Sequence, residues 1–159
     1  MREGHRIIRE VIESGIDPYS CMEPILDSIA CAREWAQVKR GHDAKFGDVL
    51  ARAIWFTTAS GRKLAAVETE WFGSPGALMG AGADVVVCLN PAHGDKKIKK
   101  YTVAVRRDQG LTVTPTLVEI EKLEGGWGGP VHGTICGSPQ DRSSVLGFEE
   151  VVKIVQATL

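Results

Sequence analysis

The residues best suited to chemistry lie in a glycine-rich segment near the end of the chain. Residues 124–144 have the sequence EGGWGGPVHGTICGSPQDRSS. Glycine loses much backbone entropy on folding, so closely spaced glycines favour sharp turns or a close approach of the backbone to a ligand. Arginine, serine and histidine side chains bind anions such as phosphate, as do successive backbone N–H groups. We therefore interpret residues 125–144 as a binding site for an anionic ligand.

The first half of this segment contains candidate residues that each have two interpretations. The glycines would offer backbone N–H groups to the anion, or form a turn that binds nothing; they are Gly125, Gly126, Gly128 and Gly129. Trp127 would stack on a base or ring, or fold back over the core as a lid. His132 would hydrogen-bond a phosphate, because its pKa lies near neutrality, or simply occupy a strand edge.

The second half adds Ser138, Arg142 and Ser143 as candidate ligand-binding residues. Ser143 or Ser144 would cap the final helix, whose N-terminus would bind an anion together with the arginine. Ordinary capping with a solvated arginine is the alternative. A run of lysines forms either a solvated turn or an electrostatic guide for a phosphorylated chain; it consists of Lys96, Lys97, Lys99 and Lys100.

The apolar pattern predicts the elements that must position these residues. Helical periodicity indicates helices at residues 3–14, 22–39, 44–54, 75–82, 114–123 and 148–158. Short apolar or alternating runs indicate strands at residues 63–69, 84–89, 101–107 and 131–136. The short turn after the second strand favours an antiparallel pair with the third. The helix between the first and second strands favours a parallel pair.

These elements predict an α/β fold with a mixed β-sheet of about four strands and packed helices. An N-terminal helical segment precedes it. We expect two parts: a linker-like helical segment at residues 1–54 and an α/β domain at residues 55–159.

Composition limits the class of protein. The chain has 159 residues and a net charge of −1, which argues against non-specific nucleic-acid binding by a basic domain. Its four cysteines contain no CxxC pair; we expect buried free thiols at Cys21, Cys31, Cys88 and Cys136. No apolar run approaches the ~18 residues of a membrane span. We therefore expect a cytoplasmic protein without a membrane partner.

The element order after residue 60 resembles the C-terminal, substrate-binding (DHHA1-like) half of DHH-type phosphoesterases. In that family a motif GG(G)H-x-x-A-A-G follows a helix and enters a strand, and an arginine often lies near the end of the preceding strand. GGWGGPVHGTICG, residues 125–137, occupies that place here. Arg106 is the candidate arginine, with Arg107 beside it. His132 does not directly follow a glycine pair, and Gly133-Thr134 replaces the Ala-Ala pair.

The resemblance implies a ligand-binding domain for a phosphorylated or nucleotide substrate, without a cofactor of its own. The family's catalytic half holds two Mn²⁺ or Mg²⁺ ions and is marked by an Asp-His-His motif, which does not occur in this chain. Metal ions would therefore belong to a catalytic half elsewhere. The expected partners are a phosphorylated small molecule or short nucleic acid, and a catalytic domain or a second copy. Two alternatives remain: a small hydrolase that uses His132 with Ser138 or a nearby acid, and a subunit with a role in assembly or dimerisation.

Overall fold

The computed structural model describes residue 41 and residues 43–129 and 133–159. The chain divides into two compact units, Met1–Lys45 and Phe46–Leu159. The second unit therefore begins at Phe46 rather than at residue 55. The helices expected at residues 3–14 and 22–39, together with Cys21 and Cys31, lie outside the described residues.

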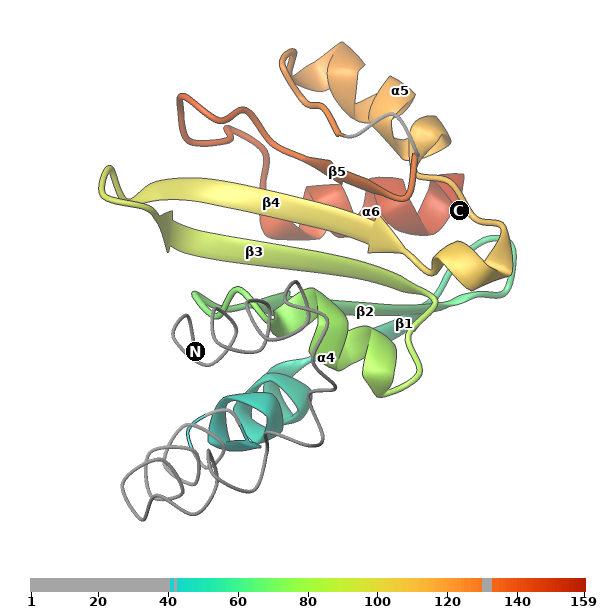
Figure 1. Ribbon diagram of the computed structural model, residues 1–159. Helices are drawn as coiled ribbons and strands as arrows, with labels where there is room; N and C mark the ends of the chain where they lie inside the picture. Colours follow the sequence, from blue (N-terminus) through green and yellow to red (C-terminus); the bar gives the residue numbers. More distant parts are fainter. Residues whose placement is uncertain (1–40, 42, 130–132) are drawn as a thin grey trace, which may run out of the picture. The chain divides into compact units, whose positions relative to one another are not determined.

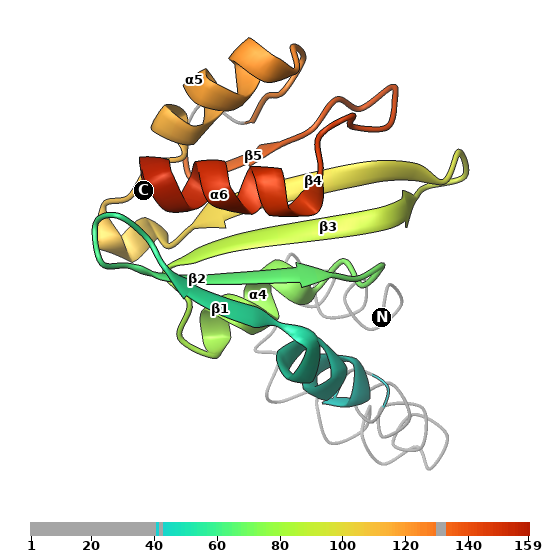
Figure 2. The same ribbon diagram turned by 180° about the vertical axis from the view of Figure 1, so that it is seen from behind.

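The second unit is a five-stranded mixed sheet with helices on both faces (Figures 1 and 2). A helix at residues 43–52 comes first. The elements that follow are β1 (Ile54–Thr57), β2 (Lys63–Glu68), α4 (Ser74–Gly80), β3 (Val85–His93), β4 (Ile98–Val105), the 3₁₀ helix η1 (Arg107–Gln109), α5 (Thr114–Leu123), β5 (Ile135–Gly137) and α6 (Phe148–Thr158). The predicted α/β class with a mixed sheet is confirmed.

The strands follow their sequence order across the sheet, β1-β2-β3-β4-β5. β2 and β3 are parallel and are connected through α4, whereas β3 and β4 form the expected antiparallel hairpin. The sheet has one strand more than expected. β1 was not predicted: the helix expected at residues 44–54 included Ile54, which instead pairs with Ala66, and Thr57 pairs with Lys63 at the edge of the sheet.

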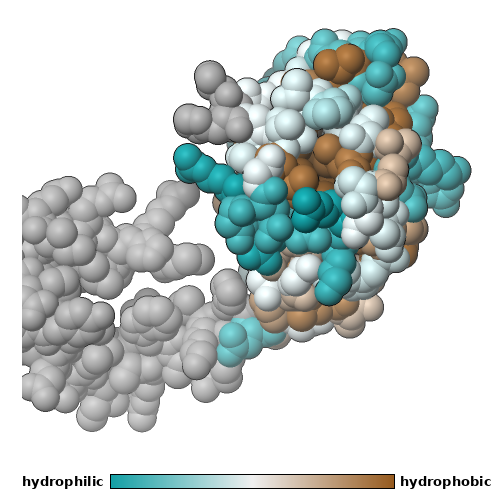
Figure 3. Space-filling view, turned by 90° about the vertical axis from the view of Figure 1, so that its right-hand side faces the viewer, coloured by the Kyte–Doolittle hydropathy of each residue, from teal (hydrophilic) through white to brown (hydrophobic). Residues whose placement is uncertain are grey.

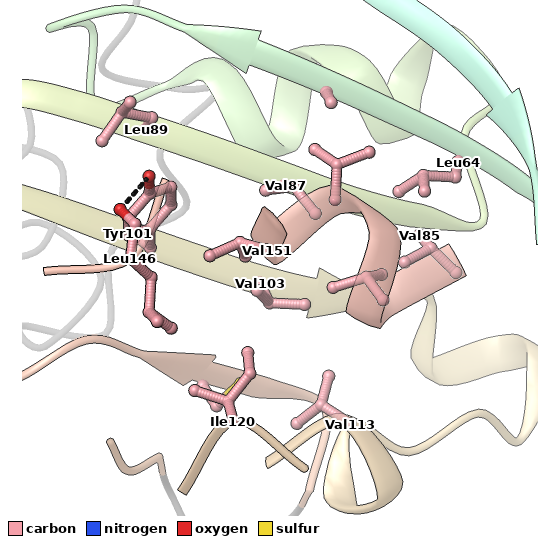
Figure 4. Close-up of a cluster of buried hydrophobic side chains, with 14 of the residues drawn as sticks. Leu64, Val85, Val87, Leu89, Tyr101, Val103, Val113, Ile120, Leu146 and Val151 are labelled. Atoms are coloured by element: carbon pink, nitrogen blue, oxygen red, sulfur yellow. Dashed lines mark hydrogen bonds between the residues drawn. The ribbon is translucent and has the colours of Figure 1, made fainter. Parts of the chain in front are cut away.

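One face of the sheet packs against α5 and α6. The alternation along β3 places Val85, Val87 and Leu89 on this face, in one cluster with Ile120 of α5 and Val151 of α6. Figure 4 shows these side chains converging between the sheet and α6. All five are almost fully buried, so this cluster forms the main core of the unit.

The opposite face packs against α4 and the helix at residues 43–52. Val86 and Cys88 of β3 lie here with Leu78 of α4 and Val49 of the first helix. This helix was expected at residues 44–54 with Val49 turned inward; Val49 is buried as predicted, but the helix ends at residue 52. Cys88 is a buried free thiol, as predicted, and so is Cys136 on the α5–α6 face.

Helix α6 begins later than the predicted cap. Gly147 is its N-cap, and the Gly147 N–H donates to Glu150 Oε2 (3.3 Å). The expectation that Ser143 or Ser144 caps this helix is therefore wrong. Both serines instead bond to other elements, because extended backbone separates them from the first helical turn.

No helix in the described part of the chain is both long and apolar enough to cross a membrane.

Candidate functional site

The glycine-rich segment leaves α5 at its C-terminal end and returns alongside β5. The Gly128 N–H donates to the Gly137 carbonyl (3.1 Å), and the Gly137 N–H donates to the Gly128 carbonyl (2.8 Å). This antiparallel bridge makes the segment an outer neighbour of β5. The N–H of Gly128 therefore donates within the protein. The expectation that this N–H binds an anion is not met in this structure.

Close packing and a turn explain two of the glycines. A Cβ atom on Gly129 would lie 2.0 Å from the carbonyl oxygen of Ile135, so only glycine fits there. Gly126 has a φ of +91°, a conformation that residues with side chains rarely adopt. Gly125 and Gly128 have open space where a Cβ would stand.

Buried Glu124 binds both ends of the segment. Its carboxylate accepts hydrogen bonds from Trp127 Nε1–H (2.8 Å), from the Ser144 hydroxyl (2.6 Å) and from the Val145 N–H (3.0 Å). Burial raises the pKa of Glu124, but these three hydrogen bonds, with a smaller contribution from Arg142, outweigh burial and hold the pKa below its ordinary value. The group is therefore a carboxylate at neutral pH.

Trp127 belongs to the core. Its side chain is 5% exposed, and its ring stacks on Tyr101 with 5.8 Å between centroids and 23° between planes. The indole N–H is taken by Glu124. The expectation that Trp127 stacks on a ligand is therefore not met in this structure, because neither the ring nor the N–H is free; the alternative interpretation, a lid on the core, holds.

The serines of the segment fasten it to the start of β4. Ser138 Oγ accepts the Tyr101 N–H (2.9 Å), and Ser143 Oγ accepts the Lys99 N–H (3.0 Å). Ser138 is only 1% exposed. A buried hydroxyl with this bond cannot reach a substrate, so Ser138 is not available to the hydrolase alternative as a nucleophile.

Two lysines of the basic run bind the same segment. Lys99 Nζ donates to the Leu146 carbonyl (2.7 Å), and Lys100 Nζ donates to the Ser138 carbonyl (3.4 Å). Burial lowers the pKa of Lys100. Lys96 and Lys97 are exposed in the turn between β3 and β4. The run therefore divides into two structural lysines and two solvated ones.

Arg142 lies against the start of the glycine segment. Its Nη2 donates to the Gly125 carbonyl (2.5 Å), and its Nη1 is 3.6 Å from an Asp141 carboxylate oxygen. Half of its side chain is exposed. The structure thus brings together Arg142, Gly125 and Gly126 at the end of the sheet where β4 begins.

Arg106 lies at the opposite end of β4. It follows the last residue of that strand, and the seven residue steps from Lys99 to Arg106 span about 23 Å in an extended strand. The predicted site residues therefore form two groups and not one. Figure 3 views the molecule from the side toward which β4 runs, where hydrophilic side chains surround a smaller apolar area.

The middle of the glycine segment, Gly133 and Thr134, lies at the end of β4 that precedes Arg106. The Val105 N–H donates to the Thr134 carbonyl (2.9 Å), which holds Gly133 and Thr134 against the end of β4. The Arg106 guanidinium donates two bonds to Asp108, from Nε to Oδ1 (3.0 Å) and from Nη2 to Oδ2 (2.7 Å). These bonds raise the pKa of Arg106 and lower that of Asp108.

Two threonines that the sequence analysis did not select complete this end. Thr112 Oγ1 donates to the Gly133 carbonyl (3.0 Å) and lies 2.8 Å from Thr114 Oγ1. Gly133 itself has a φ of +63°, and a Cβ on it would lie 2.6 Å from Thr112 Oγ1. A Thr-x-Thr pair directly before Pro115 marks a helix start, which was the available signal for these hydroxyls.

His132 and its neighbours at residues 130 and 131 lie outside the described residues. Across the described ranges, no group of three or more histidine, cysteine or acidic side chains is placed to hold a metal ion. A role for Mn²⁺ or Mg²⁺ from a separate catalytic half stays a prediction.

Comparison of the sequence with known protein families gave no match, and a search of curated proteins gave no significant relative.

Proposed function

We propose that this protein binds a phosphorylated ligand, a nucleotide or a short oligonucleotide, at the end of the sheet where β4 meets the glycine segment. The observation that carries this proposal is the Val105–Thr134 hydrogen bond. It places Gly133 and Thr134, in the middle of the glycine-rich segment, beside the residue that precedes Arg106, although the two parts lie far apart in sequence. Backbone turns and a guanidinium at close quarters are a common arrangement for phosphate.

The ion pair with Asp108 makes Arg106 suitable for binding a phosphate. Asp108 holds Nε and Nη2 in fixed directions, which leaves the other N–H groups of the guanidinium for a ligand. The side chain is 35% exposed, so a ligand can reach it from solvent. The exposed hydroxyls of Thr112 and Thr114 supply further polar groups nearby.

The resemblance to the substrate-binding half of DHH-type phosphoesterases agrees with this choice. In that family an arginine near a strand end and a glycine–histidine motif occur in the same order as Arg106 and residues 125–137 here. If the proposal holds, hydrolysis requires the family's catalytic half with its Mn²⁺ or Mg²⁺ ions, and this chain supplies binding. That catalytic half is then a partner domain.

Arg106→Gln tests the proposal, and Arg107→Gln is its matched control on the adjacent residue. Binding of nucleoside monophosphates, short oligonucleotides, cyclic dinucleotides and polyphosphate is measured by isothermal titration, with and without Mn²⁺. We expect Arg106→Gln to weaken binding about tenfold or more, because hydrogen bonds to a charged group are lost. We expect Arg107→Gln to bind like the wild type. The Arg106–Asp108 pair is exposed, so its loss should change stability little.

Two results would overturn this assignment. Equal binding by Arg106→Gln and the wild type removes Arg106 from the site. A loss of binding in Arg142→Gln with normal binding in Arg106→Gln moves the ligand to the other end of β4, beside Gly125. Failure of the wild type to bind any member of the panel overturns the binding function itself and favours the assembly alternative.

A further inference from the structure

Glu124 is the buried carboxylate of the described part of the chain, and its hydrogen bonds go to Trp127, Ser144 and Val145. It lies directly after α5 and is 6% exposed. A carboxylate in such a place is costly unless hydrogen bonds compensate for the water it has lost. Its three donors come from residues on both sides of the glycine segment, so the compensation also closes that segment into a loop.

The loop closed by Glu124 contains the contacts that hold the first part of the glycine segment beside β5. Trp127 enters the loop next to Gly128, whose bridge to Gly137 lies inside it. Gly129 then packs on the Ile135 carbonyl. The last residue of the segment, Ser144, is held by the hydrogen bond from its hydroxyl to the Glu124 carboxylate. Through this chain of contacts, the position of Glu124 fixes where Gly128 and Gly129 lie beside β5.

An amide cannot replace the carboxylate at this position. Oε2 accepts from both Trp127 and Ser144, whereas Oε1 accepts from the Val145 N–H. Glutamine has one accepting oxygen and an NH₂ group that only donates. In either orientation of a glutamine amide, its NH₂ would face a backbone or indole N–H, so at least one of the three bonds would be replaced by a donor–donor contact.

We propose that Glu124 is the positioning residue of the phosphate-binding segment, and that ligand affinity depends on its carboxylate although it does not contact the ligand. This inference rests on the proposed function. It assigns to Glu124 the fixed path of Gly128 and Gly129, which lead toward the part of the segment beside Arg106. Nothing in the resemblance to DHH-type phosphoesterases assigns a role to this residue.

The test compares Glu124→Gln with Glu121→Gln, an exposed glutamate three residues earlier on α5. Amide hydrogen exchange by NMR reports on the Gly128 and Gly137 N–H groups, and Val87 in central β3 reports on the whole unit. The indole N–H resonance of Trp127, identified by its absence in Trp127→Phe, reports on the bond to the carboxylate. Dissociation constants are measured for the four nucleoside 5′-monophosphates.

We expect Glu124→Gln to shift the Trp127 indole resonance and to lose protection at Gly128 and Gly137 more than at Val87. Affinity should fall about tenfold, the size expected for losing well-placed hydrogen bonds. Glu121→Gln should match the wild type in all three measurements. Trp127→Phe keeps an aromatic side chain but removes the indole N–H and its bond to Glu124, so its affinity should lie between those of Glu124→Gln and the wild type. This variant also tests the inference if Glu124→Gln does not fold.

Two results overturn the inference: unchanged protection at Gly128 in Glu124→Gln, or lost protection with affinity within about twofold of the wild type, well below the expected loss. An equal loss of protection at Val87 also overturns it, because Glu124 would then stabilise the whole unit and not the segment. If the wild type binds no mononucleotide, the proposed function fails and Glu124 loses its role in binding, whereas the exchange measurement still decides whether it holds the segment.

Discussion

Gly129 provides a sharp test of the path of the glycine segment. Replacing it by alanine would place a Cβ atom 2.0 Å from the Ile135 carbonyl oxygen and 3.0 Å from the Cys136 Cα, where ordinary contacts lie at 3.4–4 Å. The obstructing atoms are backbone and cannot rotate away. Ile135 and Cys136 are themselves paired to β4, so Gly129 and the residues next to it must move instead.

The cost follows from what such a movement breaks. A shift of about 1 Å or more separates Gly128 from Gly137, whose two hydrogen bonds contribute about 0.5–1.5 kcal/mol each. Forcing extra volume into a packed site costs about 1–3 kcal/mol. Allowing for partial relaxation, we expect Gly129→Ala to lower the free energy of unfolding by about 2–4 kcal/mol. At about 2–4 °C per kcal/mol, the melting temperature should fall by about 5–15 °C.

Gly128→Ala is the control, because no atom lies within 4 Å of a Cβ built there. It should be neutral, or more stable by up to about 1 kcal/mol through the reduced entropy of the unfolded chain. Thermal and urea unfolding followed by circular dichroism measure both variants. A melting temperature for Gly129→Ala equal to that of Gly128→Ala would refute the close approach of the segment to β5.

Two further predictions follow from pKa values. The pKa of Glu124 is lowered in the folded protein, so its stabilising contribution is complete above the unfolded value near 4.5 and is lost as the pH falls through the lower folded value. Urea unfolding between pH 3 and pH 6 should therefore show an acid-side loss of stability that exceeds the loss in Glu124→Gln by about 1.4 kcal/mol per unit of pKa difference; an equal loss in that variant would contradict this. Burial raises the pKa of the Cys88 thiol to about 11 and of the Cys136 thiol to about 12. Iodoacetamide at about pH 8 should therefore modify neither thiol until the protein unfolds, since only the thiolate reacts; peptide mass spectrometry checks this, and modification of the native protein would show that the thiols are accessible.

Local pattern was sufficient for most elements of the second unit. The apolar run before Leu89 has the composition of a strand buried on both faces, and β3 is the central strand. Thr114-Pro115 starts α5 as expected, because proline is suited to the first helical turn. β1 was missed because Ile54–Thr57 continues the apolar pattern of the helix before it. Its strand conformation comes from pairing with β2, which no window of a few residues contains.

The candidate site was predicted less well than the fold. The sequence drew attention to the glycine segment, but it gave no sign that Trp127 would stack on Tyr101 or that Ser138 would bond to the same residue's N–H. Glu124 looked like an ordinary helix-end glutamate. Its importance depends on partners up to 21 residues away in sequence, at Val145.

The sequence by itself determined most of the helices and strands of the second unit, including the central strand, because periodicity acts over a few residues. Tertiary structure alone decided which polar groups remain free. Hydrogen bonds occupy the Oγ of Ser138, which accepts from Tyr101 37 residues away, and the N–H groups of Trp127 and Gly128, which donate within the glycine-rich segment. They also separated Arg106 from Arg142 by the length of a strand. Satisfaction of buried polar groups is a property of the whole packed chain, so only the folded protein shows which residues are left to bind a ligand.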